Sequence, residues 1–265
     1  MIIAQISDTH LALDTPDTDQ RISDFERTVA DINALDPLPD VIVHTGDIVH
    51  NGRADEYAQA VAILGKARAP VYVIPGNKDD RANLRAAFAP RGYLAPGGAG
   101  FIDYAIEDHA VRLIGVDTLN AGSNKGDFCA ERARRLIELI DAEPTKPIAV
   151  FAHHPPFMVP VGPDPLNFET PEMMERLRRA LQHSGRVVGV FSGHVHRPSE
   201  GDVEGIPAIV VPCIATTLRK GEYPAHMKSR PVYYLHRYDP AWGVTTEARI
   251  VGTRSSVASI RSDAA

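Results

Sequence analysis

Two histidines separated by one residue follow the apolar run of residues 187–191, in the sequence Gly193-His194-Val195-His196. A short apolar run bounded by turn residues is typical of a buried strand. In an extended segment, residues i and i+2 normally point to the same side. A turn at Gly193 would splay the two imidazole rings, so that each could reach a different metal ion. The pair is a weak signal alone, and its meaning depends on polar residues upstream.

Polar side chains also follow four earlier predicted strands, each at the point where the strand ends. Together with the two histidines they are Asp8, His10, Asp47, Asn77, His153, His194 and His196. In an open α/β sheet, ligands bind beyond the carboxyl ends of the strands. Donors gathered there could bind two divalent ions about 3.5–4 Å apart, with Asp47 as the natural bridging carboxylate. Carboxylate and imidazole donors suit zinc, iron or manganese, and the lack of cysteine among them argues against a closed structural zinc site.

The elements that must position these donors begin as an alternation of strands and helices. Apolar periodicity predicts strands over 2–7, 41–43 and 71–74, with helices over 22–35, 54–67 and 81–88. This order forms a βαβαβ unit, which requires parallel strands joined by crossover helices.

The second half of the chain changes character. It predicts a hairpin over 101–106 and 111–116, helices over 131–140 and 171–183, and strands over 147–152, 187–191, 208–211, 232–235 and 244–250. Three loops, 92–100, 119–128 and 155–168, are expected to form the pocket walls. The proline-rich residues 155–165 favour an irregular lid over regular structure.

Composition narrows the classes of function. The chain has 265 residues, 44% of them apolar, with a net charge of −6 and two cysteines that show no framework spacing. Nucleic acid is an unexpected partner because no basic patch is evident. No apolar run reaches the roughly 20 residues of a membrane helix, and the N-terminal residues lack a basic segment typical of an export signal. We therefore expect a cytoplasmic protein in a reducing compartment.

Five motifs in order resemble those of the calcineurin-like metallophosphoesterases: Asp8-x-His10, Gly46-Asp47, Gly76-Asn77-x-Asp79, His153 before His154-Pro155-Pro156, and Gly193-His194-x-His196. Two neighbouring segments, residues 46–53 and Asn124-Lys125-Gly126, resemble the bacterial glycerophosphodiesterase and class III cyclic-nucleotide phosphodiesterase branch. The resemblance implies a mixed α/β (α+β) fold, a four-layer αββα sandwich of two mixed β-sheets flanked by helices. We expect one metallophosphoesterase domain over 1–253 and a tail over 254–265.

The resemblance also implies a role for each motif residue. One metal ion would be held by Asp8, His10, Asp47 and His196, and a second by Asp47, Asn77, His153 and His194. The two divalent ions would be manganese, iron, zinc or cobalt. A hydroxide held between them would attack phosphorus in line. The implied substrates are small phosphodiesters, either cyclic nucleotides or glycerophosphodiesters; a broad-range phosphomonoesterase and a non-catalytic scaffold are the alternatives.

Lys78 departs from the family pattern, which usually has histidine after Gly-Asn. Lysine keeps a positive charge, but its ordinary pKa of about 10.4 makes it a poor proton donor at neutral pH. We expect Lys78 to contact the phosphate electrostatically, with protonation of the leaving group left to solvent or to another histidine; two nearby dications would depress its pKa, so a role as acid stays open.

Other polar residues have plainer interpretations. Asn77, Lys78, His50 and His154 are expected to contact substrate, although His154 also fits a residue that packs behind a ligand. The loop 122–126 is expected to shape the pocket, and Asp79 to orient a neighbour. We expect core or sheet-edge placement for His44 and surface or interface positions for His109, His183, His226 and His236. Arg132, Arg134 and Arg135 should form a solvated helix face.

The apolar, strand-rich segment 206–250 has two open interpretations. It could simply be the edge of the second sheet. It could also be a cap through which the chain forms a homodimer or higher homo-oligomer, as relatives of this family often do.

Overall fold

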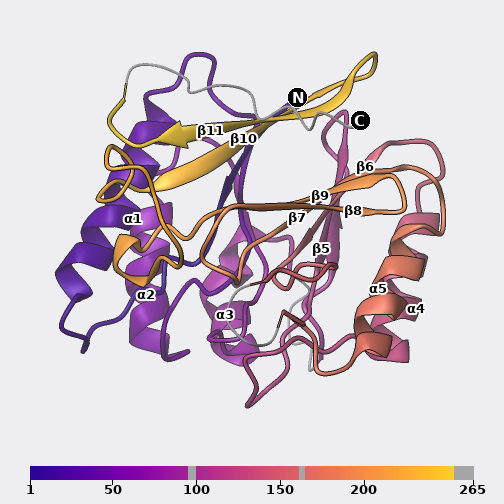
Figure 1. Cartoon of the computed structure of the whole chain (residues 1–265), viewed down its shortest axis with the longest axis horizontal. Helices are drawn as coiled ribbons and strands as arrows, with labels where there is room; N and C mark the ends of the chain where they lie inside the picture. Colours follow the sequence, from indigo (N-terminus) through magenta and orange to yellow (C-terminus); the bar gives the residue numbers. More distant parts are fainter. Residues whose placement is uncertain (95–99, 161–164, 254–265) are drawn as a thin grey trace.

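The structure is a computed structural model of the chain in which residues 1–94, 100–160 and 165–253 are described. Two β-sheets face each other, and helices cover the outer face of each sheet (Figure 1). This four-layer arrangement confirms the predicted αββα sandwich. The expected tail, residues 254–265, lies outside the described residues, as do residues 95–99 of the first predicted wall loop and 161–164 of the third.

The first sheet has the strand order β11-β10-β1-β2-β3. Its strands are β1 (Ile2–Ile6), β2 (Val41–His44), β3 (Val71–Val73), β10 (Val232–Asp239) and β11 (Gly243–Ile250). β1, β2 and β3 are parallel, whereas β10 pairs antiparallel with both β1 and β11. The predicted βαβαβ unit is therefore confirmed. The expectation that segment 206–250 forms the edge of the second sheet is wrong for β10 and β11, which complete the first sheet because β10 pairs with β1.

The second sheet has the order β4-β5-β6-β7-β9-β8. Its strands are β4 (Tyr104–Ile106), β5 (Arg112–Val116), β6 (Ile148–Ala152), β7 (Val187–Ser192), β8 (Ser199–Val203) and β9 (Ile206–Val210). β5, β6, β7 and β9 are parallel, and the outer strands β4 and β8 are antiparallel to their neighbours. Sequence reasoning missed β8, because its sequence Ser-Glu-Gly-Asp-Val has no apolar run and its edge position demands none.

The helices divide into two groups, one on each sheet. α1 (Thr18–Asn33), α2 (Ala54–Leu64) and α3 (Arg81–Phe88) pack on the first sheet, with Phe25, Tyr57 and Phe88 fully buried. α4 (Ala130–Asp141) and α5 (Pro171–Leu181) pack on the second through Leu136 and Leu177. One short 3₁₀ turn, η1 (Ala89–Arg91), comes directly after α3, and another, η2 (Thr216–Leu218), comes after β9. In the described part of the chain, no helix is both long and apolar enough to span a bilayer.

Side-chain hydrogen bonds mark the starts of α3 and α5. The Thr170 side chain accepts a hydrogen bond from Met173 N, with Pro171 in the first turn of α5, and Asp80 caps α3 by accepting from Asn83 N. α1 begins four residues earlier than its apolar face predicts, because residues 18–21 are polar and carry no periodic signal.

Two surface predictions are wrong. His236 is fully buried in β10 and not on the surface, because its ring nitrogens find partners on β1 and β11. Arg132 is also buried, at 3% exposure, because its guanidinium lies over the Phe101 ring and donates to Leu119 O. Arg134 does lie on the exposed face of α4, and the buried position of His44 confirms a core histidine.

Candidate metal centre

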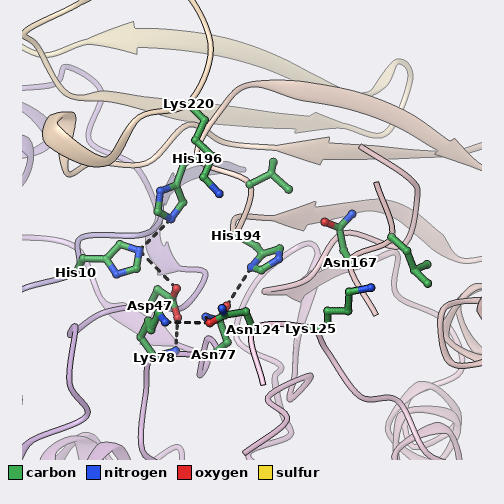
Figure 2. A pocket seen from close by; sticks show the side chains of 12 residues that line it. His10, Asp47, Asn77, Lys78, Asn124, Lys125, Asn167, His194, His196 and Lys220 are labelled. Carbon is green, nitrogen blue, oxygen red and sulfur yellow. Dashed lines mark hydrogen bonds and ion pairs between the residues drawn. The ribbon is translucent and has the colours of Figure 1, made fainter. Parts of the chain in front are cut away.

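The polar motif residues meet where strands of both sheets end. They follow β1 (Asp8, His10), β2 (Asp47), β3 (Asn77), β6 (His153) and β7 (His194, His196), and Figure 2 shows five of the seven around one pocket. The structure thus brings together all seven residues predicted from the spacing.

The backbone at this edge is unusually strained. Asp8, His10, Asp47, His194 and His196 all have positive φ, between 42° and 74°. Glu204 is the only other described non-glycine residue in this region of φ. Positive φ is uncommon for residues with a Cβ, and such strain concentrates at functional sites. The sequence does not predict this strain, because aspartate and histidine occur in many backbone conformations.

Glycine permits close approach at this edge, between the sheets at Gly193 and between two loops of the first sheet at Gly76. A Cβ on Gly193 would lie 1.9 Å from Ser7 Oγ and 2.5 Å from Asp8 Oδ2. A Cβ on Gly76 would lie 2.3 Å from Asp47 Oδ1. Both motif glycines are therefore required by close packing, and any side chain there would displace a neighbouring carboxylate.

One half of the cluster is formed by Asp8, His10, Asp47 and His196. His10 Nε2 lies 3.0 Å from His196 Nε2 and 3.5 Å from Asp47 Oδ2. His196 Nε2 lies 3.4 Å from Asp8 Oδ1. One donor atom from each of the four residues falls within 4.8 Å of the others, so this group could hold a metal ion.

The other half is formed around Asn77. Its Oδ1 lies 3.1 Å from His153 Nε2 and 3.0 Å from His194 Nδ1. Asp47 Oδ2 lies 3.6 Å from the same His153 nitrogen. The oxygen that approaches His10 therefore also approaches His153, which is the position required of a carboxylate shared by two cations.

In His153 and His196, the ring nitrogen that points away from the cluster is hydrogen-bonded to the backbone, and this bond determines which nitrogen faces the cluster. His153 Nδ1 lies 2.7 Å from Thr45 O, and His196 Nδ1 lies 2.8 Å from Leu218 O. A peptide oxygen only accepts, so each neutral ring carries its proton on Nδ1 and presents a lone pair from Nε2. The lone pair of His153 then faces two further acceptors, Asn77 Oδ1 and Asp47 Oδ2. Acceptors that converge in a buried site require a cation among them, so these residues fit divalent metal ions.

In the absence of a metal ion, the close approach of these groups shifts the pKa values of His153 and Asp47. Burial lowers the pKa of His153, but the Asp47 carboxylate, together with Asp8 and the Thr45 carbonyl, outweighs burial and raises that pKa to about 9. Burial raises the pKa of Asp47, but His153 and His10 outweigh it and hold the pKa well below its usual range. A proton on His153 thus takes the place that a cation would occupy, and metal binding must displace it.

A second carboxylate, Asp79, holds two site loops in place. It accepts hydrogen bonds from Gly76 N at 2.8 Å, Ile48 N at 3.2 Å and the Tyr57 hydroxyl at 2.8 Å. It therefore ties the loop that carries Asp47 to the loop that carries Asn77. This contact agrees with the predicted orienting role of Asp79.

The pocket beside the cluster has a volume of about 290 Å³. Lys78, Asn124, Lys125, Asn167 and Lys220 line it together with the metal cluster (Figure 2). Asn124 Oδ1 accepts from Lys78 Nζ at 2.9 Å and from Asn77 Nδ2 at 3.4 Å. The second contact turns the oxygen of Asn77 toward the histidines. The loop 122–126 therefore shapes the pocket, as predicted.

Two of the predicted substrate contacts lie outside this lining. His50 Nδ1 lies 3.5 Å from His10 Nδ1, on the side of that ring away from the cluster. His154 is buried, with Nδ1 2.7 Å from the Thr118 hydroxyl. One of its nitrogens also falls within 4.8 Å of donor atoms of His153 and His194. Substrate contact by His50 and His154 stays a prediction.

Sequence reasoning missed Lys220 and Asn167. Lys220 follows a strand and a 3₁₀ turn, and its backbone nitrogen donates to His196 O at 3.1 Å. Nothing in its local sequence marks it, because a lone lysine in a polar loop is ordinary. Leu218 O, which orients His196, belongs to the same loop and carries no side-chain signal at all.

Comparison with known proteins places these features in context. The family model described as calcineurin-like phosphoesterase matches residues 1–198. A probable glycerophosphodiester phosphodiesterase of Arcobacter nitrofigilis is 30% identical over 95% of this chain and 94% of that protein. A probable cyclic nucleotide phosphodiesterase of Rhodopseudomonas palustris is 31% identical over 68% of this chain and 65% of that protein. A dimetal phosphatase of Danio rerio shares the fold, with a TM-score of 0.68, 13% identity and coverage of 97% and 98% of the two chains.

Proposed function

This chain belongs to the calcineurin-like phosphoesterase family, and from that premise we propose that it hydrolyses small phosphodiesters with the aid of two divalent metal ions. Members of the family use two divalent metals. We assign Asp8, His10, Asp47 and His196 to one ion. Asp47, Asn77, His153 and His194 are assigned to the other.

The observation that carries the proposal is the convergence of acceptors. Asn77 Oδ1 and Asp47 Oδ2 both converge on His153 Nε2, at 3.1 and 3.6 Å, so without a metal ion the two acceptors share the single proton of that nitrogen. A structural polar cluster would pair each acceptor with a donor. When bound, the two ions would supply a water-derived nucleophile at neutral pH and neutralise charge on the phosphate.

The chain's own groups divide the remaining tasks. Lys78 N donates to Asp47 Oδ1 at 2.7 Å, which leaves Oδ2 directed between the two halves of the cluster. The Lys78 ammonium, held by Asn124 at the pocket, would contact a phosphate oxygen and offset its charge. In this assignment Lys78 and Asp47 are the catalytic residues.

The substrate class follows from the pocket and the relatives. A volume of about 290 Å³ is at the small end for ligand sites and suits a compact diester. The two relatives above are named for glycerophosphodiesters and cyclic nucleotides. We propose one of these two classes as the substrate of this chain.

Two chromogenic substrates test the proposal. Protein reconstituted with Mn²⁺ should cleave bis(p-nitrophenyl) phosphate with a higher kcat/KM than p-nitrophenyl phosphate, and chelation followed by removal of the ions should abolish both reactions. A higher kcat/KM for the monoester would replace the proposal with a phosphomonoesterase. Failure to cleave either substrate with bound metal would support a non-catalytic scaffold.

Two further proposals concern organisation. We propose that residues 1–253 act as one metallophosphoesterase domain. Segment 206–250 supplies strands to both sheets, and its use in homo-oligomer formation stays a proposal that sedimentation velocity would test.

A further inference from the structure

A second hollow adjoins the pocket of the metal cluster. It has a volume of about 100 Å³ and is lined by Arg197, Pro198, Lys220, Gly221, Glu222 and Tyr223. Lys220 lines both cavities, so the hollow continues from the place where substrate would bind. In Figure 2 the Lys220 side chain extends toward the pocket beside His196.

The hollow is attached firmly to the metal cluster. Lys220 N and the Tyr223 hydroxyl both donate to His196 O, at 3.1 and 3.2 Å. Arg219 supports the same loop, because its guanidinium lies 4.7 Å from the centre of the Tyr223 ring and donates to Met227 O at 2.6 Å. The Lys220 backbone and the Tyr223 side chain are thus anchored to His196.

Two cations line this hollow, the Arg197 guanidinium and the Lys220 ammonium. Within residues 1–94, 100–160 and 165–253, neither the Arg197 guanidinium nor the Lys220 ammonium makes a hydrogen bond or an ion pair. Other arginines near the site are paired: Arg21 with Asp17 at 2.8 Å and Arg81 with Asp117 at 2.6 Å. Glu222 is the carboxylate that also lines the hollow, and it contacts neither cation.

Unpaired cations beside a binding pocket attract a further anion. The described lining of the main pocket carries three lysines, Lys78, Lys125 and Lys220, and Asp47 is its carboxylate. A phosphodiester has one negative charge, which the metal ions and Lys78 would meet. The cations farther along are therefore available to another part of the substrate, and a cationic alcohol there would be repelled.

We propose that Arg197 and Lys220 form an anion subsite, which makes this chain select phosphodiesters whose alcohol carries a second anionic group, such as a carboxylate or phosphate. This inference rests on the proposed function. It adds a requirement for a second negative charge on the substrate, which the classes glycerophosphodiester and cyclic nucleotide do not by themselves define.

Three diesters with one leaving group provide the test. Each has p-nitrophenolate as leaving group, and the second alcohol is glycolate (anionic), ethanol (neutral) or choline (cationic). Because the chemistry is constant, the subsite should act on KM while kcat stays similar. Exposed charge pairs contribute enough for KM to rise up to about fivefold at each step from glycolate to ethanol to choline. The differences should shrink as salt shortens the screening length from about 30 Å at 0.01 M to 8 Å at 0.15 M.

Charge-reversal variants locate the effect. Lys220→Glu and Arg197→Glu should each remove or invert the KM order, whereas Lys228→Glu should keep it. Lys228 is a matched control, because it is an exposed lysine in the same segment and lines neither cavity. Arg197→Gln repeats the test with no new carboxylate, and thermal unfolding confirms that each variant is folded.

The outcomes separate the two proposals. Cleavage of the ethyl diester by the metal-loaded protein supports the proposed function whatever the KM order. If all three diesters are cleaved with equal KM, or if the order survives in both Lys220→Glu and Arg197→Glu, the subsite is wrong and the proposed function stands. If no diester is cleaved, both proposals fall.

Discussion

Two clusters of buried polar side chains join the two sheets, and they differ in how their hydrogen bonds close. One is the metal cluster at the strand ends. The other, the Gln5–His236 network, links Gln5 on β1, His236 on β10, Thr246 on β11 and the backbone of Ser192 on β7. Both contain buried histidine, so composition alone does not separate a structural cluster from a functional one.

In the Gln5–His236 network every donor meets an acceptor. Gln5 Nε2 donates to Ser192 O at 3.0 Å, so its Oε1 faces His236 Nε2 at 2.9 Å. The Thr246 hydroxyl lies 2.8 Å from His236 Nδ1, which it can serve as donor. In the metal cluster, two acceptors converge on one histidine nitrogen, and a proton or a metal ion must lie among them. The comparison teaches that a buried polar cluster that closes by itself stabilises the fold, whereas one that does not close needs a ligand.

The strongest way to break the metal cluster is Asp47→Ala, because one side chain serves both halves. Loss of the shared carboxylate should lower kcat/KM by about 10³-fold, equivalent to about 4 kcal/mol of transition-state stabilisation. Steady-state assays with bis(p-nitrophenyl) phosphate and Mn²⁺ measure it. A decrease below tenfold would mean that Asp47 does not bridge two ions.

The matching change in the closed network is His236→Ala. It leaves Gln5 Oε1 without its donor and opens a cavity, so the free energy of unfolding should fall by about 2–3 kcal/mol. Urea unfolding measures this loss. The rise in Tm on addition of Mn²⁺ should be the same as in the unsubstituted protein; its disappearance would show that the two clusters are not independent.

A smaller effect is expected at the edge of the metal cluster. Lys78→Ala removes the ammonium near the phosphate and should lower kcat/KM about tenfold on diesters with poor leaving groups, or about 1.4 kcal/mol. Lys228→Ala, on the exposed surface, provides the control. A value within about twofold of the unsubstituted protein, or under roughly 0.5 kcal/mol, would overturn the electrostatic role of Lys78.

The smallest effect is a pH dependence of the closed network. Burial lowers the pKa of His236 to about 3 from an ordinary 6.5. Below pH 6.5, His236 is therefore protonated in the unfolded chain but stays neutral in the folded chain down to about pH 3. The free energy of unfolding falls as the pH falls through this window. Between pH 7.5 and 5.5, His236→Gln should lose about 1 kcal/mol less stability than the unsubstituted protein. Equal losses in urea unfolding would mean that His236 is not held neutral.

All seven residues of the metal cluster could be predicted from the sequence because they follow strands as short polar motifs. The strand ends converge by topology, so Asp8, Asp47 and His194 could be brought together without knowledge of any side-chain contact. The Gln5–His236 network could not be predicted, because its members form no local motif. His236 lies inside a strand whose partners, Gln5 and Thr246, come from the beginning and the end of the chain, and neither partner has a local signature.

Pocket walls and edge elements were predicted less well. β8 is polar, so apolar periodicity does not predict it. Arg132 points inward because its guanidinium lies over the Phe101 ring and donates to Leu119 O. Lys220 reaches the pocket only because its loop is bonded to His196. Such contacts depend on how distant segments pack, which a pattern within one segment does not record.

The central claim is that the converging acceptors hold two cations that share Asp47. Anomalous diffraction from crystals of the protein grown with excess Mn²⁺ tests it directly. The account predicts two peaks on either side of Asp47 Oδ2, one bounded by His10 and His196 and the other by His153 and His194. A single peak, or no peak within the cluster, would contradict it.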